Sequence, residues 1–177
     1  MPHIHTKPGE HDATASALII RFDTPEPRLL LHLHKKHGRF MQPGGHVELH
    51  ETPWQAVLHE IVEETGYKLS QLELLQPPQR LKSLSKVILH PVPMGENTHK
   101  IGEDHYHTDR MYVFAAEAAP LGTPGIGEAT EFKWVTAEEL QQMPDSTLGS
   151  AIREIGLYGL NVCATEWIRV PLSDFQA

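Results

Sequence analysis

The alternation of apolar and polar residues predicts strands in the first part of the chain. Residues 13–22 and 28–34 are largely apolar, and Thr24-Pro-Glu-Pro27 interrupts the chain between them. Apolar runs bounded by turn residues are typical of strands, so we expect these two to pair as a hairpin. A charged turn over residues 35–39 and a short strand over residues 40–45 follow. Residues 1–12 are polar and are expected to form a loose arm.

A helix is predicted directly after the Pro43-Gly-Gly45 turn. Thr52 suits the N-cap, Pro53 suits the first helical position, and Gln55 completes a capping box. Gly66 is placed to end this helix. Helical spacing puts Trp54, Val57, Leu58, Ile61 and Val62 on one apolar face, and Glu60, Glu63 and Glu64 on the other side. We expect Trp54 and Ile61 to lie in the core.

The remainder of the chain predicts shorter elements. Strands are expected over residues 86–92, 106–118 and 132–135, with connections over residues 76–85, 93–103 and 119–127. Thr136 is expected to cap a helix that ends near Met143, and residues 146–156 are expected to form the last long helix. Residues 166–177 have no pattern that assigns them. No repeat or linker divides the chain, so residues 1–177 are predicted to form a single domain.

Composition narrows the class of protein. The 177 residues are 40% hydrophobic, as a globular domain requires, and the formal net charge of −8 argues against a nucleic-acid polymer as partner. No apolar run approaches the about 18 residues that span a bilayer, and the first residues resemble no signal peptide. The single cysteine, Cys163, excludes an intrachain disulfide and indicates a reducing compartment. We therefore expect a cytoplasmic protein without a membrane partner.

Carboxylates crowd the segment that follows the glycine turn. Glu60, Glu63 and Glu64 are close in sequence, and neighbouring carboxylates repel one another unless a cation neutralises them. Hard oxygen ligands favour Mg²⁺ or Mn²⁺, and Mg²⁺ usually shares its coordination shell with substrate phosphates. The segment therefore predicts a metal-dependent enzyme that acts on a small phosphate compound. The thirteen histidines are dispersed and show no zinc-finger spacing.

The spacing of Gly45, Glu51, Glu60, Ile61, Glu63, Glu64 and Gly66 resembles the signature of the Nudix hydrolases. His59 departs from that signature, which has arginine there, and Tyr67 takes the final bulky position. The resemblance implies an α/β fold, a Nudix-type α/β/α sandwich with a mixed β-sheet between helices. It also implies metal-dependent hydrolysis of a diphosphate linkage in a nucleoside diphosphate-type substrate by an activated water. Many such domains dimerise, so a homodimer is an option.

The resemblance also assigns roles to the acidic residues. Glu60, Glu63 and Glu64 would be the metal ligands, and Glu51 would be a closely associated acid. The catalytic base is left open between Glu63 or Glu64 themselves and a loop carboxylate. Glu128 sits where some members of the family place a further metal-contacting or basic glutamate, and Glu131 is the neighbouring option; both could instead be exposed loop carboxylates.

The substitution at His59 bears on whether the site is active. Arginine is permanently charged and can orient a glutamate, whereas histidine is shorter and titrates near neutrality. We expect His59 to donate a hydrogen bond to Glu51 or to a neighbour of it and so to support catalysis. The alternative is a catalytically weak or inactive Nudix domain that binds a nucleotide-like ligand.

Substrate contacts are predicted on both sides of the glutamate segment. Gly44 and Gly45 let the backbone approach phosphates closely. His105, His107 and Asp109 alternate onto one face of a strand, where they either touch phosphate or a second metal or form a solvated face. Arg39, with Lys35 and Lys36, either meets phosphate or forms an exposed turn.

Two other activities fit the sequence poorly. His59-Glu-x-x-Glu63 lacks the second histidine of the zinc metalloprotease motif. Isopentenyl diphosphate isomerases of the same fold rely on a cysteine, but Cys163 lies far beyond the motif and is expected to be a buried small hydrophobe.

Overall fold

A nine-stranded mixed sheet forms the centre of the computed structural model, which describes residues 7–102, 104–149 and 151–175. The strands are β1 (His11–Arg21), β2 (Arg28–His34), β3 (Arg39–Met41), β4 (Gly44–His46), β5 (Leu72–Gln76), β6 (Gly95–Ile101), β7 (His105–Ala116), β8 (Phe132–Val135) and β9 (Ile168–Pro171). The helices are α1 (Pro53–Thr65), α2 (Ala137–Gln142), α3 (Ile152–Tyr158) and α4 (Ala164–Glu166).

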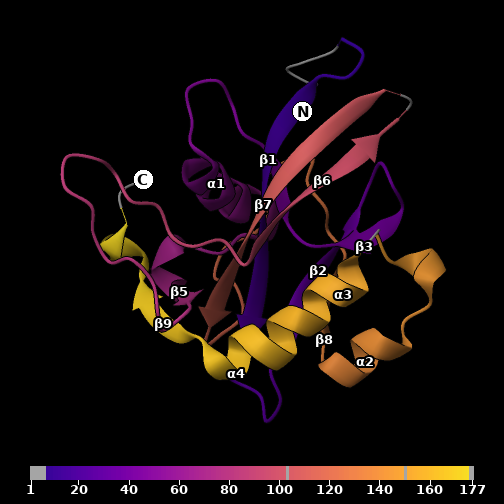
Figure 1. The fold of residues 1–177 in the computed structure, drawn as a ribbon. Helices are drawn as coiled ribbons and strands as arrows, with labels where there is room; N and C mark the ends of the chain where they lie inside the picture. Colours follow the sequence, from indigo (N-terminus) through magenta and orange to yellow (C-terminus); the bar gives the residue numbers. More distant parts are fainter. Residues whose placement is uncertain (1–6, 103, 150, 176–177) are drawn as a thin grey trace.

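Two long strands, β1 and β7, run parallel through the middle of the sheet (Figure 1). The main path of the sheet is β3-β2-β1-β7-β5-β9, and the other pairs of described strands are antiparallel. The first half of β1 pairs with β4 and its end pairs with β2. The first half of β7 pairs with β6 and its end pairs with β5. The two long strands therefore exchange partners midway, and β4 and β6 flank the same end of the sheet.

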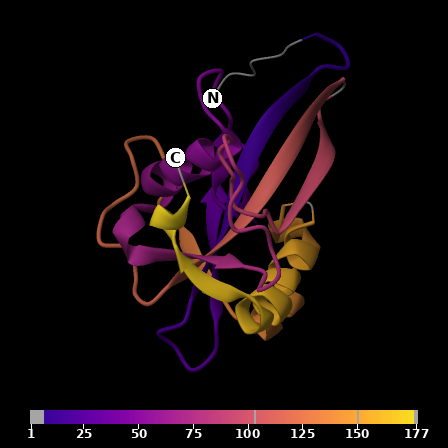
Figure 2. The ribbon, with the colours of Figure 1, turned by 60° about the vertical axis from the view of Figure 1, so that its left-hand side comes forward.

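Helices cover both faces of this sheet, which confirms the predicted α/β sandwich (Figure 2). Alternate residues of a strand point to opposite faces. Ala17 and Ile19 of β1 accordingly pack in the core on the α1 side, whereas Leu18 and Ile20 pack in the core that α2 and α3 cover. The second halves of both long strands are buried on both faces, so those halves read as apolar runs rather than as an alternating pattern.

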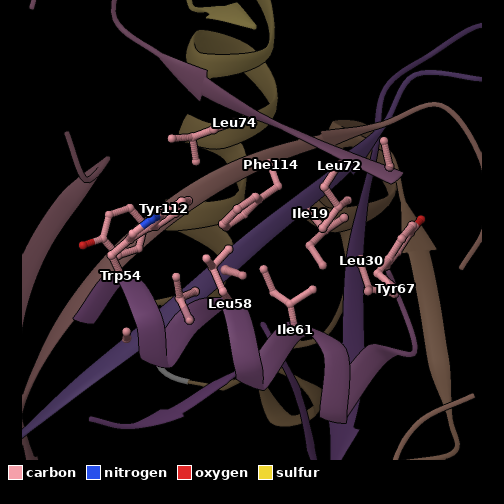
Figure 3. Close-up of a cluster of buried hydrophobic side chains, with 14 of the residues drawn as sticks. Ile19, Leu30, Trp54, Leu58, Ile61, Tyr67, Leu72, Leu74, Tyr112 and Phe114 are labelled. Atoms are coloured by element: carbon pink, nitrogen blue, oxygen red, sulfur yellow. The ribbon is translucent and has the colours of Figure 1, made fainter. Parts of the chain in front are cut away.

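Helix α1 forms as its sequence predicts. Thr52 and Gln55 make both hydrogen bonds of the capping box, and Gly66 ends the helix in the left-handed conformation with φ of 73°. Its apolar side chains meet the sheet in the cluster of Figure 3, where the rings of Trp54 and Phe114 stack with centroids 6.0 Å apart. Trp54 and Ile61 are fully buried, as expected.

The buried face of α1 differs from the predicted one, because it includes two of the glutamates and leaves out one of the apolar residues. Val62, expected on the apolar face, is 43% exposed, whereas Glu60 and Glu64, expected on the other side, are buried. Strand β4 lies against the glutamate edge of the helix, since the Gly44 N–H donates to Glu64. A polar partner thus replaces the apolar contact that the periodicity indicates.

The predicted strand over residues 86–92 is wrong, and so is the predicted loop over residues 93–103. Lys86 has a φ of 65°, and Val92 hydrogen-bonds to the Gln76 side chain instead of to a neighbouring strand. Strand β6 forms within the predicted loop as an exposed, polar edge partner of β7. An edge strand that is solvated on its surface has no apolar pattern to reveal it.

The last helix also differs from its prediction over residues 146–156. Helix α3 begins later, and the helical path continues through a π-helical turn at Gly159–Cys163 into α4. Gly156 lies inside α3 and does not end it, and it packs closely against α2: a Cβ there would lie 2.6 Å from Leu140 Cδ2. The unassigned tail forms β9, which pairs with β5, a strand that the sequence pattern also left unassigned.

The N-terminal boundary shifts slightly. His11 and Asp12, predicted to belong to a loose arm, are the first residues of β1. Residues 1–6 of that arm lie outside the described residues. Within the described part of the chain, every helix is too short or too polar to cross a membrane.

Candidate functional site

A cleft of about 370 Å³ opens where β4, α1 and the first halves of β1 and β7 meet. One wall carries the α1 glutamates Glu60, Glu63 and Glu64, together with Glu128 from the loop before β8. Gly44 and Gly45 also line the cleft. The other wall carries polar side chains of β1, β6 and β7, namely Thr14, Ser16, His99, His107 and Asp109. The structure therefore brings most of the predicted site residues into one hollow.

Glycine at position 45 lets β4 approach the first glutamate very closely. A Cβ built on Gly45 would lie 2.0 Å from Glu60 Oε1, so no larger residue fits while that carboxylate keeps its place. Glu64 is held from the neighbouring residue, since the Gly44 N–H donates to Glu64 Oε2 over 2.7 Å. The glycine turn thus fixes the positions of two motif carboxylates.

The buried carboxylates are poorly neutralised by the protein itself. Burial raises the pKa of Glu64 to about 8; the Gly44 N–H opposes this shift, and the charges of Glu60 and Glu128 add to it. Burial also raises the pKa of Glu60, with His59 acting in the opposite direction and Glu63 adding to the rise. Within the described residues, the buried Glu60 Oε1 has no well-aligned hydrogen-bond donor, since its polar neighbour His59 Nε2 lies 3.4 Å away. This donor set fits a divalent cation, which would supply the missing positive charge.

His59 contacts two of the predicted acidic residues at once. Its Nδ1 atom lies 2.8 Å from Glu51 Oε1, and its Nε2 atom lies 3.4 Å from Glu60 Oε1. The expected hydrogen bond to Glu51 is therefore present. Neither Glu51 nor His59 lines the cleft in the described structure; the His59 ring joins Glu51 to Glu60, which does line it.

A further histidine, His32, was missed by the sequence reasoning. It is 2% exposed, and its Nε2 atom lies 4.0 Å from Glu64 Oε2. Burial, with a smaller effect of the charge of His34, lowers the pKa of His32 to about 4, so the ring is neutral near pH 7. The available signal was a polar residue inside the leucine run of β2, a position that a purely packing role would give to an apolar residue.

The β7 residues predicted to face the cleft divide into two groups. Asp109 lines the cleft, but both of its oxygens are occupied: Thr14 Oγ1 donates over 2.9 Å and Ser16 Oγ over 2.7 Å. His107 also lines the cleft. His105 lies outside the lining, with its Nε2 atom 3.2 Å from Asp12 Oδ2.

Some of the predicted residues lie elsewhere in the described structure. Arg39 borders a separate hollow, where its Nη1 atom donates to the Leu148 carbonyl over 3.4 Å. Of the loop carboxylates, Glu128 lines the cleft and Glu131 does not. Lys36 lines the cleft, whereas the Lys35 ammonium donates to the Gly127 carbonyl.

Cys163 lies in the opposite layer of the molecule. It is fully buried in the core that α2 and α3 cover, and burial raises the pKa of its thiol to about 12. A protonated thiol that is sealed away from the cleft cannot attack a substrate there.

Comparison with known proteins connects this architecture to one family. The model of the NUDIX domain matches residues 11–154, and no curated protein matches the chain. A NUDIX-family hydrolase from Clostridium perfringens is 28% identical over 85% of this chain and 97% of its own, with a TM-score of 0.71.

Two more distant structures share the fold. The C. elegans Ap4A hydrolase in a binary complex is 18% identical over 82% of this chain and 90% of its own, with a TM-score of 0.59. The NUDIX domain of Shewanella oneidensis NrtR complexed with ADP ribose is 16% identical over 83% of this chain and 84% of its own, with a TM-score of 0.60. At these identities the likeness extends to the fold alone.

Proposed function

Because the chain belongs to the Nudix hydrolase family, we propose that it uses Mg²⁺ or Mn²⁺ to hydrolyse a diphosphate linkage in a small nucleoside diphosphate-type substrate. One observation carries the proposal: four carboxylates from α1 and from the loop before β8 line the same cleft, beside the glycine turn that β4 brings against Glu60 and Glu64. Such a concentration of negative charge beside a small-molecule cleft suits a cation and a phosphate.

Glu60, Glu63 and Glu64 would hold the metal. A bound divalent ion would polarise a phosphoryl oxygen and lower the pKa of a water molecule. Glu51 is assigned to positioning, because its contact with the site runs through the His59 ring over 2.8 Å. His59 in turn lies 3.4 Å from Glu60 Oε1, so it limits the orientations that this carboxylate can take.

The general base is assigned to Glu128. Its side chain lines the cleft from the loop, apart from the helix that carries the metal-binding glutamates. That loop is tied to α1, since the Gly125 N–H donates to the Glu63 carbonyl over 2.7 Å. A carboxylate at this place can accept the proton of an attacking water while the α1 carboxylates stay engaged. Glu63 or Glu64 would be the base if Glu128 proves dispensable.

The substrate class follows from the cleft and, loosely, from the relatives. Lys36 and His107 line the cleft and offer donors to phosphate oxygens, whereas Arg39 is directed elsewhere. One protein of the same fold is an Ap4A hydrolase and another is complexed with ADP ribose, and both compounds carry linked phosphates on a nucleoside. The buried free thiol of Cys163 suits a reducing compartment, so we place the protein in the cytoplasm.

The proposal is tested by product release with Mg²⁺ and with Mn²⁺ across a substrate panel. The panel holds nucleoside triphosphates, oxidised nucleotides, nucleotide sugars, dinucleoside polyphosphates and ADP-ribose. Glu63→Gln and Glu64→Gln should each lower turnover by about 10²–10⁴-fold, because each removes a negative oxygen while keeping the side-chain volume. Glu131→Gln is the matched control, since it makes the same change outside the cleft and should retain activity.

Near-wild-type rates in both α1 variants would refute the metal-site assignment. Silence of the folded wild type across the whole panel would favour the rival function, a domain that binds a nucleotide-like ligand without turnover. Titration of ADP-ribose and of a dinucleoside polyphosphate by calorimetry would then identify the ligand. An isomerase of this fold is tested by Cys163→Ser, which should leave the activity intact because the thiol lies in the opposite core.

A further inference from the structure

A second group of metal-binding side chains lies beside the cleft at the first residues of β1 and β7. Asp12, His105 and His107 each offer one ligand atom, and these atoms all lie within 4.8 Å of one another. The Asp12 side chain is fully buried, and its Oδ2 atom lies 3.2 Å from His105 Nε2. His46 of β4 approaches the same oxygen, with its Nε2 atom at 3.5 Å. None of these residues belongs to the glutamate motif.

The sheet fixes the positions of this group. Asp12 and His107 are register partners on the parallel strands β1 and β7, and His105 lies two residues before His107 on the same face. His46 is held by the pairing of β4 with β1, opposite Thr14. Sites built on neighbouring strands keep their geometry better than sites built on loops. Backbone hydrogen bonds of the sheet therefore preorganise the group.

The separations from Asp12 to His105 and His46 suit a shared ion. Two ligand atoms that are each about 2.0–2.1 Å from a tetrahedral ion lie about 3.3–3.4 Å from each other. The two Asp12 contacts, at 3.2 and 3.5 Å, bracket that separation. The rings also converge edge-on: the His46 and His107 rings meet at 80° and the His105 and His107 rings at 88°. The Asp12–His105 contact is also a hydrogen bond, and the other two imidazoles lie around the same buried carboxylate.

We propose that Asp12, His105 and His107 bind a second divalent metal ion, with His46 as the neighbouring nitrogen ligand. Imidazole nitrogens suit Zn²⁺ and other transition metals, whereas the oxygen-only glutamate site suits Mg²⁺ or Mn²⁺. The two sites therefore select different metals in the same molecule. His46 and His107 also line the cleft, so the second ion would lie in its wall, where a phosphate oxygen could complete the coordination.

The experiment measures binding of the metal alone and does not depend on turnover. The full chain is treated with chelator and titrated calorimetrically with Zn²⁺ in a large excess of Mg²⁺, which occupies the glutamate site. One Zn²⁺ should bind per chain. His105→Gln and His107→Gln should each weaken Zn²⁺ binding by about 100-fold or more. Loss of a residue that only supports a metal ligand already costs about 10–100-fold, and loss of a ligand itself should cost more. Asp12→Asn, which keeps the side-chain volume, should weaken Zn²⁺ binding likewise.

Three control variants separate this group from the other histidines and carboxylates of the chain that could bind Zn²⁺. His11→Gln changes the neighbouring residue of β1, whose ring stacks on Tyr106 with centroids 5.0 Å apart, and should bind Zn²⁺ as the wild type does. A His3→Gln, His5→Gln double variant should also bind normally. Glu64→Gln should leave the Zn²⁺ affinity unchanged, although it is expected to lower turnover by about 10²–10⁴-fold. Circular dichroism confirms that each variant is folded.

Two results would overturn the proposal. The first is unchanged Zn²⁺ affinity in folded His105→Gln and His107→Gln proteins. The second is loss of the Zn²⁺ site in Glu64→Gln or in the N-terminal double variant while the β7 variants retain it. Either result leaves the proposed hydrolase activity untouched, because that activity rests on the glutamate wall.

Discussion

At the scale of single residues, the main departure from the family signature is His59, which stands where the signature has arginine. An arginine there would contact a glutamate with a permanent charge. The imidazole instead uses its two nitrogens, one 2.8 Å from Glu51 Oε1 and the other 3.4 Å from Glu60 Oε1. One ring therefore links the outer acid to a carboxylate of the cleft. The substitution keeps a contact with Glu51 through a shorter side chain, and we expect that contact to orient the site.

A pair of substitutions at this position tests that interpretation. His59→Ala should lower kcat/KM by about 10–100-fold, because loss of an outer-shell partner frees the orientation of a metal-binding carboxylate. His59→Arg should retain most of the activity, since a guanidinium can reach Glu51. Steady-state kinetics on the best substrate of the panel, at several Mg²⁺ concentrations, measures both effects. His50→Ala, an exposed neighbour of the motif, is the control. Equal rates for wild type and His59→Ala would show that the contact with Glu51 is unimportant.

At the scale of elements, the site depends on how closely β4 lies against α1. The missing side chain at Gly45 admits Glu60, and the Gly44 N–H holds Glu64. Strand and helix therefore meet through carboxylates where an ordinary strand–helix contact would bury apolar side chains. This explains why the buried face of α1 is rotated toward Glu60 and Glu64 and leaves Val62 43% exposed.

Gly45→Ala should disable the site without unfolding the protein. The added Cβ would lie 2.0 Å from Glu60 Oε1, so the carboxylate has to leave its place. We expect turnover to fall by about 10²-fold or more, as misplacement of a catalytic group by about 1 Å can produce. Gly38→Ala is the control: its Cβ meets nothing within 4 Å, and its φ of 61° makes the change mildly destabilising without affecting the cleft. Enzyme assays and thermal melts of both variants distinguish a local effect on the cleft from a global loss of stability. Equal losses of activity in Gly45→Ala and Gly38→Ala would contradict a local effect.

The elements also show which features a sequence can predict. Helix α1 was predicted to the residue, because its cap, first-turn proline and terminal glycine are local signals. Strand β6 was missed because it pairs at the polar edge of β7. Residues 86–92 were misassigned because Lys86 takes a left-handed conformation and the backbone of Val92 bonds to the distant Gln76 side chain. The motif glutamates were identifiable from spacing. Their burial, the approach of His32 and the grouping of Asp12 with His105 were not, since each depends on contacts between distant strands.

At the scale of the whole molecule, the acidic cleft links stability to metal and to pH. The chain carries a formal charge of −8 and buries Glu64 beside Glu60 and Glu128. The pKa of Glu64 rises from 4.5 to about 8 on folding, mainly because of burial. Between pH 4.5 and about 8, the folded state therefore keeps a proton on Glu64 that the unfolded state has released. Because the unfolded state is favoured by releasing that proton, the free energy of unfolding is highest below pH 4.5 and falls as the pH rises toward about 8.

Removal of the metal should consequently destabilise the folded wild type more at high pH than at low pH, and Glu64→Gln should abolish this pH dependence. In the presence of a chelator, the free energy of unfolding of the wild type should fall by about 1–3 kcal/mol more than that of the variant as the pH rises from 5 to about 8. For a chain of this size, this corresponds to several degrees of Tm. Saturating Mg²⁺ at pH 8 should restore the wild type, because an ion that binds only the folded state stabilises it, and should not shift the variant. Thermal melts over pH and Mg²⁺ concentration measure both effects. Glu131→Gln, which removes the same charge outside the cleft, should behave as the wild type. If Mg²⁺ stabilised Glu64→Gln as strongly as the wild type, the ion would be bound elsewhere. A bound cation would then not explain why the cleft contains buried carboxylates.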